Sequence, residues 1–317
     1  KSKGAGTAGF RKEEKKGEQQ LKKKIAGIAA PSGNVLNLED VKKAAKLLEE
    51  DGWEVKLGKS VLTSFQRFGG VSDEARAEDF NRLCGKCDFV LAARGGYGLN
   101  RILPTIDFEE IHKRGVWVGG FSDITLFSLA YLAKYQGKSL HCPTASVLGK
   151  SSVSAFSIES FRTALSSKQY AIEFETDAAN LKVSGTLWGG NLSVLVSALG
   201  TPYFPDIEGG VLFLEDLAEP AYKIERNLLQ LAQAGVLQKQ QAIVLGHFSH
   251  IRNSAHDFGY SIEDAKEILR KTIKVPVIEG LPFGHVDDLC TLVIGAPCCL
   301  SVNSRHCTLT IPDAPNF

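Results

Sequence analysis

Residues 91–125, LAARGGYGLNRILPTIDFEEIHKRGVWVGGFSDIT, carry the pattern that decides the fold of this chain. One apolar run ends in the glycine-rich turn Arg94–Gly98, and a second ends in Gly120-Phe121-Ser122-Asp123. Apolar runs of this length are typical of parallel strands that are buried on both faces. Ligand sites of parallel sheets form at the carboxyl ends of the strands, so the stretch predicts a glycine-rich turn and a serine at one sheet edge.

The same alternation of strand and helix patterns extends on both sides of this stretch. We predict strands over 24–30, 54–57, 87–93 and 116–120, and helices over 38–50, 72–83 and 124–134. Strands that alternate with helices are typical of a parallel sheet covered by helices. The sequence therefore predicts an N-terminal α/β domain over residues 25–150.

The pattern loosens over residues 151–180, which we interpret as a linker region before a second domain over 181–317. Strands are expected in the second domain over 183–188, 211–214, 242–246, 275–278, 290–294 and 307–311. Helices are expected after the Gly189-Gly190-Asn191 turn and over 220–234 and 261–272. The second domain is thus also α/β.

Composition limits the possible partners. The 317 residues carry a net charge of +1, which implies no general attraction to nucleic acid or to a membrane surface. Residues 1–24 alone carry a net charge of +6 and almost no apolar residues, as expected of a basic flexible tail. No apolar run is long enough for a signal peptide or a membrane span. The seven scattered cysteines favour a reducing, cytoplasmic compartment, and the C-x-x-C pair Cys84 and Cys87 has no second pair at zinc-site spacing.

Ser122 is the candidate nucleophile, because it lies where a strand is expected to turn into a helix. The N–H groups of Gly95, Gly96 and Asp123 would be available nearby to stabilise an oxyanion. The alternative is that Ser122 only caps the helix, as serine commonly does. The spacing is not that of the G-x-S-x-G turn, so the sequence leaves both readings open at this point.

A serine nucleophile needs a base, normally a histidine, and a carboxylate that orients it. His285 and His247 each follow a predicted strand, whereas the other five histidines lie in less distinctive contexts. Glu215 and Asp216 follow the apolar residues 211–214, so a half-buried, paired carboxylate is expected there. A helix cap is the alternative role for these carboxylates.

Three further residues are candidate substrate contacts. Arg94 has the fork geometry that binds carboxylates, although it could equally pair with an internal aspartate. Tyr97 lies in the same turn, and Trp188 lies either at a pocket or in the core. No phosphate-binding glycine motif accompanies these residues, so no nucleotide cofactor is expected.

Six segments together resemble the serine-type LD-carboxypeptidases, the muramoyltetrapeptide carboxypeptidase family. In family order they are Ala29–Gly33, Arg94–Gly98, Gly120–Thr125, Gly185–Leu192, Leu212–Asp216 with Arg226, and Gly280–His285. One departure is Cys142-Pro143, where relatives often carry Gly-Pro. The resemblance covers the chain from about residue 25 to its end.

The resemblance implies a Rossmann-like N-terminal domain, a smaller β-rich C-terminal domain and a homodimer. It also implies Ser122 as nucleophile, His285 as base and Glu215 as the orienting carboxylate. The oxyanion hole would be Gly95 or Gly96 with the N–H of Asp123, and no metal or other cofactor would take part. The implied reaction is cytoplasmic release of terminal D-alanine from murein tetrapeptides, free or as UDP-MurNAc-tetrapeptide, during peptidoglycan recycling.

Two alternatives share this fold. The microcin C immunity-type peptidases resemble the same family but cleave aminoacyl-nucleotide conjugates. A non-catalytic binding protein with a degraded triad is the other alternative, and the presence of all three triad residues argues against it.

Overall fold

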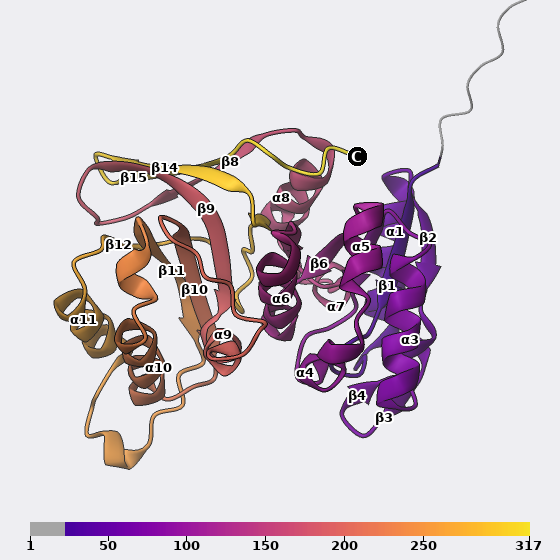
Figure 1. Cartoon of the computed structure of the whole chain (residues 1–317), viewed down its shortest axis with the longest axis horizontal. Coiled ribbons are helices and arrows are strands. Elements are labelled where there is room, and N and C mark those ends of the chain that lie inside the picture. Colours follow the sequence, from indigo (N-terminus) through magenta and orange to yellow (C-terminus); the bar gives the residue numbers. More distant parts are fainter. Residues whose placement is uncertain (1–22) are drawn as a thin grey trace, which may run out of the picture.

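The computed structural model describes residues 23–317, drawn in colour in Figure 1. The predicted basic tail over 1–24 lies outside the described residues, except for Lys23 and Lys24. The described chain forms two sheets, one in each half of the molecule (Figure 1). None of its helices is long and apolar enough to cross a membrane.

The first sheet has six strands in the order β13-β7-β6-β5-β1-β2, and all neighbours are parallel except β13 and β7. Its strands are β1 (Ile25–Ala29), β2 (Glu54–Leu57), β5 (Phe89–Ala92), β6 (Trp117–Gly120), β7 (Ser139–His141) and β13 (Leu292–Ile294). A small hairpin, β3 (Ser64–Phe65) and β4 (Phe68–Gly69), stands apart from it.

Helices surround the first sheet because they bury apolar side chains against it. They are α1 (Leu38–Glu50), α2 (Lys59–Leu62), α3 (Asp73–Cys84), α4 (Leu99–Ile102), α5 (Phe108–Arg114), α6 (Thr125–Tyr135) and α7 (Ala145–Leu148). Asn37 and Ser72 cap α1 and α3 by accepting backbone N–H bonds with their side chains, which fixes where these helices begin. Helix α6 is buried over its first eight residues and also packs on the second half of the chain, on β9 and α9.

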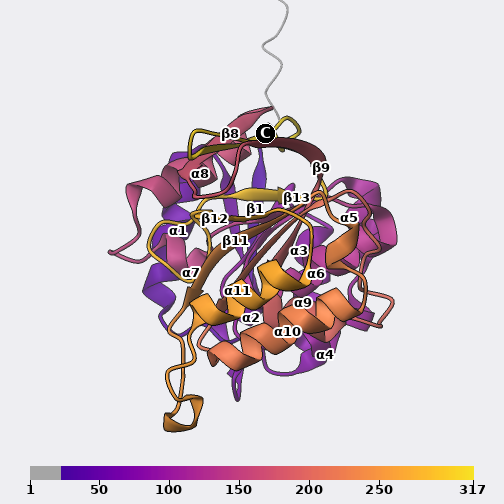
Figure 2. The same cartoon turned by 90° about the vertical axis from the view of Figure 1, so that its left-hand side faces the viewer.

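The second sheet has seven strands in the order β12-β11-β10-β9-β14-β15-β8. They are β8 (Tyr170–Glu175), β9 (Leu181–Asn191), β10 (Val211–Leu217), β11 (Ala242–Ser249), β12 (Val277–Glu279), β14 (Pro297–Asn303) and β15 (His306–Ile311). The long strand β9 joins a parallel part, through β10, to an antiparallel part, through β14. The helices of this half are α8 (Ala155–Ser166), α9 (Leu192–Ala198), α10 (Ala221–Gln233) and α11 (Ile262–Thr272); α9, α10 and α11 lie on one side of the parallel part (Figure 2).

The predicted fold class is confirmed: a parallel α/β half is joined to a β-rich α/β half, although the second half, whose sheet has seven strands against six, is not the smaller one. Two details of the structure differ from the predicted arrangement of two consecutive domains joined by a linker region. The segment 151–180, predicted as a linker region, contains α8 and β8, and β8 alternates buried and exposed residues as a half-buried strand does. Strand β13 comes from the C-terminal half of the sequence but pairs with β7 of the first sheet.

Candidate active site

Ser122 lies at a strained corner between β6 and α6. A single 3-10 turn, Ser122–Ile124, follows Phe121 and leads directly into α6. The φ angle of Ser122 is 64°, in the left-handed region that residues other than glycine rarely adopt. Such strain costs about 1–3 kcal/mol and is concentrated at functional sites. The spacing is not G-x-S-x-G, but the backbone makes the same kind of sharp strand-to-helix turn.

The glycine-rich turn after β5 approaches Ser122 closely. A Cβ atom placed on Gly95 would lie 2.8 Å from the Ser122 Cβ and 3.1 Å from its Oγ, so only glycine fits there. The Gly95 carbonyl accepts a hydrogen bond of 2.8 Å from the Gly33 N–H. Among the described residues, no protein acceptor takes the N–H of Gly95 or of Gly96. Both amides are therefore available beside the serine hydroxyl.

The carboxylate of Asp123 joins the two turns. It is buried and accepts the Leu99 N–H at 2.9 Å, just beyond the glycine-rich turn. Burial raises the pKa of Asp123. Arg76, which is fully buried, holds the same turn from beneath by donating to the Gly98 carbonyl at 3.1 Å.

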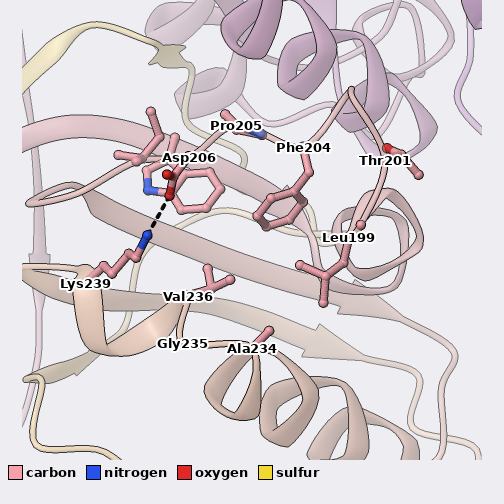
Figure 3. A pocket seen from close by; sticks show the side chains of 12 residues that line it. Leu199, Thr201, Phe204, Pro205, Asp206, Ala234, Gly235, Val236 and Lys239 are labelled. Carbon is pink, nitrogen blue, oxygen red and sulfur yellow. Dashed lines mark hydrogen bonds and ion pairs between the residues drawn. The ribbon is translucent and has the colours of Figure 1, made fainter.

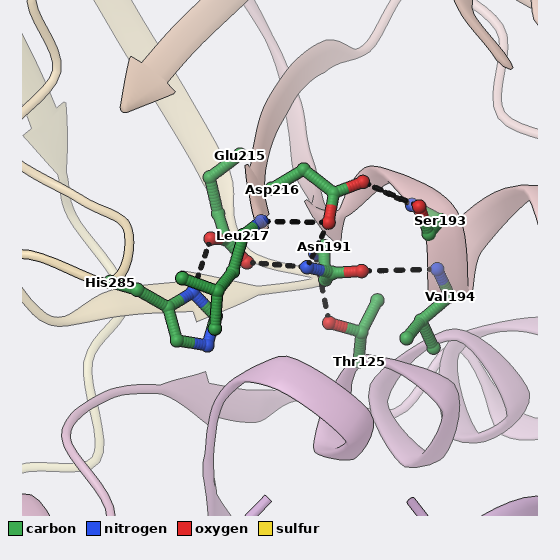
Figure 4. Close-up of polar contacts among 8 residues, drawn as sticks. All are labelled: Thr125, Asn191, Ser193, Val194, Glu215, Asp216, Leu217 and His285. Atoms are coloured by element: carbon green, nitrogen blue, oxygen red, sulfur yellow. Dashed lines mark hydrogen bonds and ion pairs between the residues drawn. The ribbon is translucent and has the colours of Figure 1, made fainter. Parts of the chain in front are cut away.

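His285 and Glu215 form a close pair in the second half of the chain (Figure 4). Nδ1 of His285 lies 2.9 Å from Oε2 of Glu215, whose side chain is fully buried on β10. The loop after β12 brings His285 to the carboxyl end of the sheet, where Glu215 also lies. The imidazole packs against Phe121, the residue before Ser122, with ring centroids 4.8 Å apart.

Asn191 connects this pair to the helix that follows the serine. Its Nδ2 donates to Oε1 of Glu215 at 3.2 Å and to Oδ1 of Asp216 at 3.0 Å (Figure 4). Its backbone N–H donates to Oγ1 of Thr125, the first residue of α6, at 3.0 Å. A Cβ on Gly190 would lie 2.5 Å from the same Thr125 oxygen, so glycine there allows β9 to approach α6.

Asp216 has a separate set of partners. Ser193 donates its N–H and its hydroxyl to Oδ2 of Asp216 at 3.0 and 2.6 Å. The carboxylate that is paired with histidine is therefore Glu215, while Asp216 ties the start of α9 to β10.

One cavity of about 430 Å³ is lined by Ser122, Gly95, Gly96, Arg94 and His285. Asp123 is not among the lining residues, although it follows Ser122 directly. No hydrogen bond joins Ser122 to His285 in the described part of the chain. The cavity brings together residues that lie at the carboxyl ends of strands in both sheets.

Arg94 presents a positive charge to this cavity. Its Nη1 donates to the Asn34 carbonyl at 3.2 Å, and within the described residues it has no carboxylate partner. Its guanidinium fits over Gly33, where a Cβ would lie 2.7 Å from Nη1. Burial, followed by the charge of Arg67, lowers the pKa of Arg94. The sequence left open whether Arg94 pairs with an internal aspartate. Among the described residues, the structure shows no such pair.

The structure places the other two candidate substrate contacts away from the cavity. Tyr97 is about two-fifths exposed and packs against Phe68 rather than lining the cavity. Trp188 is fully buried and donates Nε1 to Gln240 at 2.9 Å. Trp188 instead borders a separate cavity of about 260 Å³, seen in Figure 3, which shares no lining residue with the cavity of Ser122.

His141 is a fully buried histidine that packs against Phe213 and Phe283. Its ring lies tilted against Phe283 and meets Phe213 edge-on, with centroids 4.7 and 5.2 Å apart. Neither ring nitrogen has a partner among the described residues. Burial, and then the charge of His285, lowers its pKa to about 3. His247, the other histidine after a predicted strand, does not line the cavity of Ser122.

Sequence reasoning did not identify Asn191, Thr125 or Arg76 as site residues. Asn191 carried a weak signal, because it follows two glycines at a strand end. The roles of Thr125 and Arg76 depend on contacts between distant segments, which no local pattern reveals. Within residues 23–317, no group of three metal-ligating side chains is placed to hold a metal ion.

Comparisons with known proteins agree with this architecture. The LD-carboxypeptidase N-terminal domain family matches residues 26–142, and the LD-carboxypeptidase C-terminal domain family matches residues 184–300. The chain is 31% identical over 289 residues to a "Probable murein peptide carboxypeptidase" of Bacillus subtilis, covering 88% of this chain and 89% of that protein. The crystal structure of a muramoyltetrapeptide carboxypeptidase from Oxalobacter formigenes superposes with a TM-score of 0.84 at 36% identity, covering 92% and 99% of the two chains.

The chain is also similar to the microcin C7 self-immunity protein MccF of Escherichia coli, at 24% identity over 315 residues and covering 84% of this chain and 87% of that protein. The two matched domains and the two-sheet fold define a serine-type carboxypeptidase. The chain belongs to the LD-carboxypeptidase family.

Proposed function

We propose that this chain is a serine carboxypeptidase that removes the terminal D-alanine from murein tetrapeptides by cleaving the L,D peptide bond. The observation that carries the proposal is the His285–Glu215 pair at 2.9 Å, which faces the same cavity as the strained Ser122. Similarity to the carboxypeptidases of Bacillus subtilis and Oxalobacter formigenes supports the choice of substrate.

In the proposed mechanism, Nε2 of His285 accepts the proton of the Ser122 hydroxyl as its oxygen attacks the carbonyl before D-alanine. Glu215 accepts a hydrogen bond from the Nδ1–H group of His285. This hydrogen bond holds the imidazole in the required tautomer and stabilises the imidazolium. The imidazolium then protonates the leaving amine. Water hydrolyses the acyl-enzyme in a second step, again with His285 as the base.

The oxyanion of the tetrahedral intermediate would bind the N–H groups of the glycine-rich turn. Support for this role comes from the approach of Gly95 to Ser122 and from its unused N–H. Asp123 would contribute its own backbone N–H, because that amide follows the nucleophile at the start of a helix. Loss of one such donor costs about 10²–10³ in kcat in comparable hydrolases.

We also propose a cytoplasmic location and a homodimer. Seven free cysteines, six of them buried, fit a reducing compartment. Light scattering of the purified chain tests the dimer through the molar mass in solution.

The substrate proposal is tested by mass spectrometry of three compounds after incubation with the protein. These are UDP-MurNAc-tetrapeptide, a free tetrapeptide, and an aminoacyl-sulfamoyl nucleotide of the kind that microcin C immunity peptidases cleave. The proposal expects loss of one alanine from the tetrapeptides and no alanine loss from a matched peptide that ends in L-alanine. Cleavage of the nucleotide conjugate with both tetrapeptides intact would overturn it in favour of the aminoacyl-nucleotide reaction.

A further inference from the structure

Two cavities meet at His285. The larger, about 430 Å³, contains Ser122 and the glycine-rich turn. A second cavity of about 350 Å³ lies beyond the imidazole and is bordered by Ser152, His250 and Leu289. Five residues border both cavities: Phe121, Val147, Lys150, Leu217 and His285. The two spaces are therefore parts of one cleft, and the imidazole stands between them.

The chemistry of a serine hydrolase determines which part of the substrate lies in each cavity of this cleft. The histidine that accepts the serine proton must later deliver it to the leaving amine, so the leaving group lies on the side of the imidazole. The carbonyl oxygen lies on the opposite side, against the N–H groups of Gly95 and Gly96. The acyl part of the substrate then occupies the larger cavity, and the leaving amino acid extends toward the second one.

Among residues 23–317, the two Lys or Arg side chains of the cleft differ in the cavities they border: Arg94 borders only the larger cavity, whereas Lys150 borders both. Arg94 lies on the side of the glycine-rich turn, where its guanidinium covers Gly33. Lys150 follows α7 and is the one Lys or Arg side chain that borders the second cavity in the described part of the chain. No carboxylate lies within ion-pair distance of Lys150 among the described residues, although the exposed Asp287 borders the same cavity.

We propose that Lys150 binds the terminal carboxylate of the leaving amino acid, while Arg94 binds a carboxylate on the acyl side of the scissile bond. This assignment rests on the proposed function and specifies where each end of the substrate lies. It makes Lys150 the residue that selects a free carboxyl terminus, and so the residue that makes this enzyme an exopeptidase. A leaving group as small as alanine fits within the second cavity.

The test compares kcat/KM for a murein tetrapeptide and for the same peptide with a terminal carboxamide. Wild-type protein is expected to prefer the free acid by about 10- to 100-fold, the range for loss of a charged hydrogen bond. Lys150→Met should lower kcat/KM for the free acid by about this factor more than for the amide, so that the preference disappears. Lys150→Arg should restore part of the preference.

Arg94→Met is the matched control, because it removes the other cation of the cleft. It should lower kcat/KM for both peptides by the same factor and keep their ratio. The assignment would be overturned if the ratio of kcat/KM for the free acid to that for the amide stayed at its wild-type value in Lys150→Met and fell to one in Arg94→Met. It would also be overturned if the wild-type enzyme did not distinguish the two peptides. If the wild type hydrolysed neither peptide, the proposed function itself would fail, and the assignment with it.

Discussion

At the scale of single residues, Asn191 links the two halves of the site. One amide nitrogen donates to both Glu215 and Asp216, and the backbone N–H of the same residue donates to Thr125 on α6. The helix that begins beside Ser122 and the strand that carries Glu215 are therefore held by one residue, through its backbone N–H and its side chain respectively. This makes Asn191 a positioning residue: it acts on the reaction through the orientation of Glu215.

Asn191→Ala should lower kcat by roughly 10- to 100-fold, because a hydrogen bond to a charged group contributes about 1.5–3 kcal/mol. KM should change little, since the substrate does not depend on this bond in the ground state. Steady-state kinetics on a murein tetrapeptide measure both constants. Ser193→Ala is the control, because it removes a bond to Asp216 and leaves Glu215 paired; equal losses in the two variants would contradict the role of Asn191.

His141 makes stability depend on pH. Its pKa is about 3 in the folded chain against 6.5 for an ordinary histidine, so the unfolded chain binds this proton first as the pH falls. The contribution of neutral His141 to stability is therefore complete above about pH 6.5 and is lost progressively between pH 6.5 and 3. His141→Phe, which keeps the packing on Phe213 and Phe283, should flatten the decline of unfolding free energy in that window.

Urea denaturation at several pH values between 4 and 7.5 measures this effect. His256→Phe, at an exposed position in a loop, is the control and should keep the wild-type slope. Parallel curves for wild type and His141→Phe would show that His141 does not remain neutral in the folded chain.

The sequence identifies some site residues much better than others. Ser122, Glu215 and His285 each lie at a strand end or beside a glycine-rich turn, and the local sequence pattern indicates such positions. Asn191 and His141 act through contacts with distant segments. Trp188 shows the opposite case: its place beside two glycines suggested a pocket, but the side chain is fully buried and bonded to Gln240.

At the scale of secondary-structure elements, the glycine-rich turn after β5 determines how closely it can approach the turn after β6, which carries Ser122. Gly95→Ala should lower kcat by about 10²–10³-fold, because the new methyl group would lie 2.8 Å from the Ser122 Cβ and push the proposed oxyanion donors away. Initial rates on a tetrapeptide, together with the melting temperature, measure the effect.

Gly85→Ala is the matched control for this substitution. Gly85 has an ordinary helical φ of −72°, and its added Cβ would meet its nearest neighbours at 3.5 and 3.6 Å. Wild-type rates are expected for this control. A Gly95→Ala enzyme that was equally active would contradict the placement of the oxyanion hole.

Elements with strong periodicity could be predicted from sequence almost to the residue, as α1 and β2 show. Strands β8 and β14 were missed, although the alternation of buried and exposed residues in β8 is the usual signal of a half-buried strand. The 3-10 turn at Ser122 and its left-handed φ could not be predicted, because tertiary packing and not local propensity imposes them.

At the scale of the whole molecule, β13 joins the two halves. It belongs to the C-terminal half of the sequence but pairs with β7, with Leu292 opposite His141. The loop that carries His285 is thus anchored at one end on the second sheet and at the other end on the first. Pairing between segments about 150 residues apart has no signature in a single sequence, so this connection could not be predicted.

Because of this connection, the two halves should unfold in a single transition. Leu292→Ala, which truncates a fully buried side chain, should lower the unfolding free energy by about 2–5 kcal/mol and shift both halves together. Trp117 on β6 and Trp188 on β9 can report each half separately by fluorescence, in variants where the other tryptophans are replaced by phenylalanine. Separate midpoints for the two probes would contradict the coupling.

The most direct test of the proposed chemistry is the turnover of a murein tetrapeptide by Ser122→Ala, measured by mass spectrometry of released alanine beside the wild type. We predict a folded variant with an unchanged circular dichroism spectrum whose kcat is reduced by roughly 10⁶-fold, the loss expected when a serine nucleophile is removed. A folded Ser122→Ala enzyme that releases D-alanine at the wild-type rate would contradict the assignment of the nucleophile and the mechanism built on it.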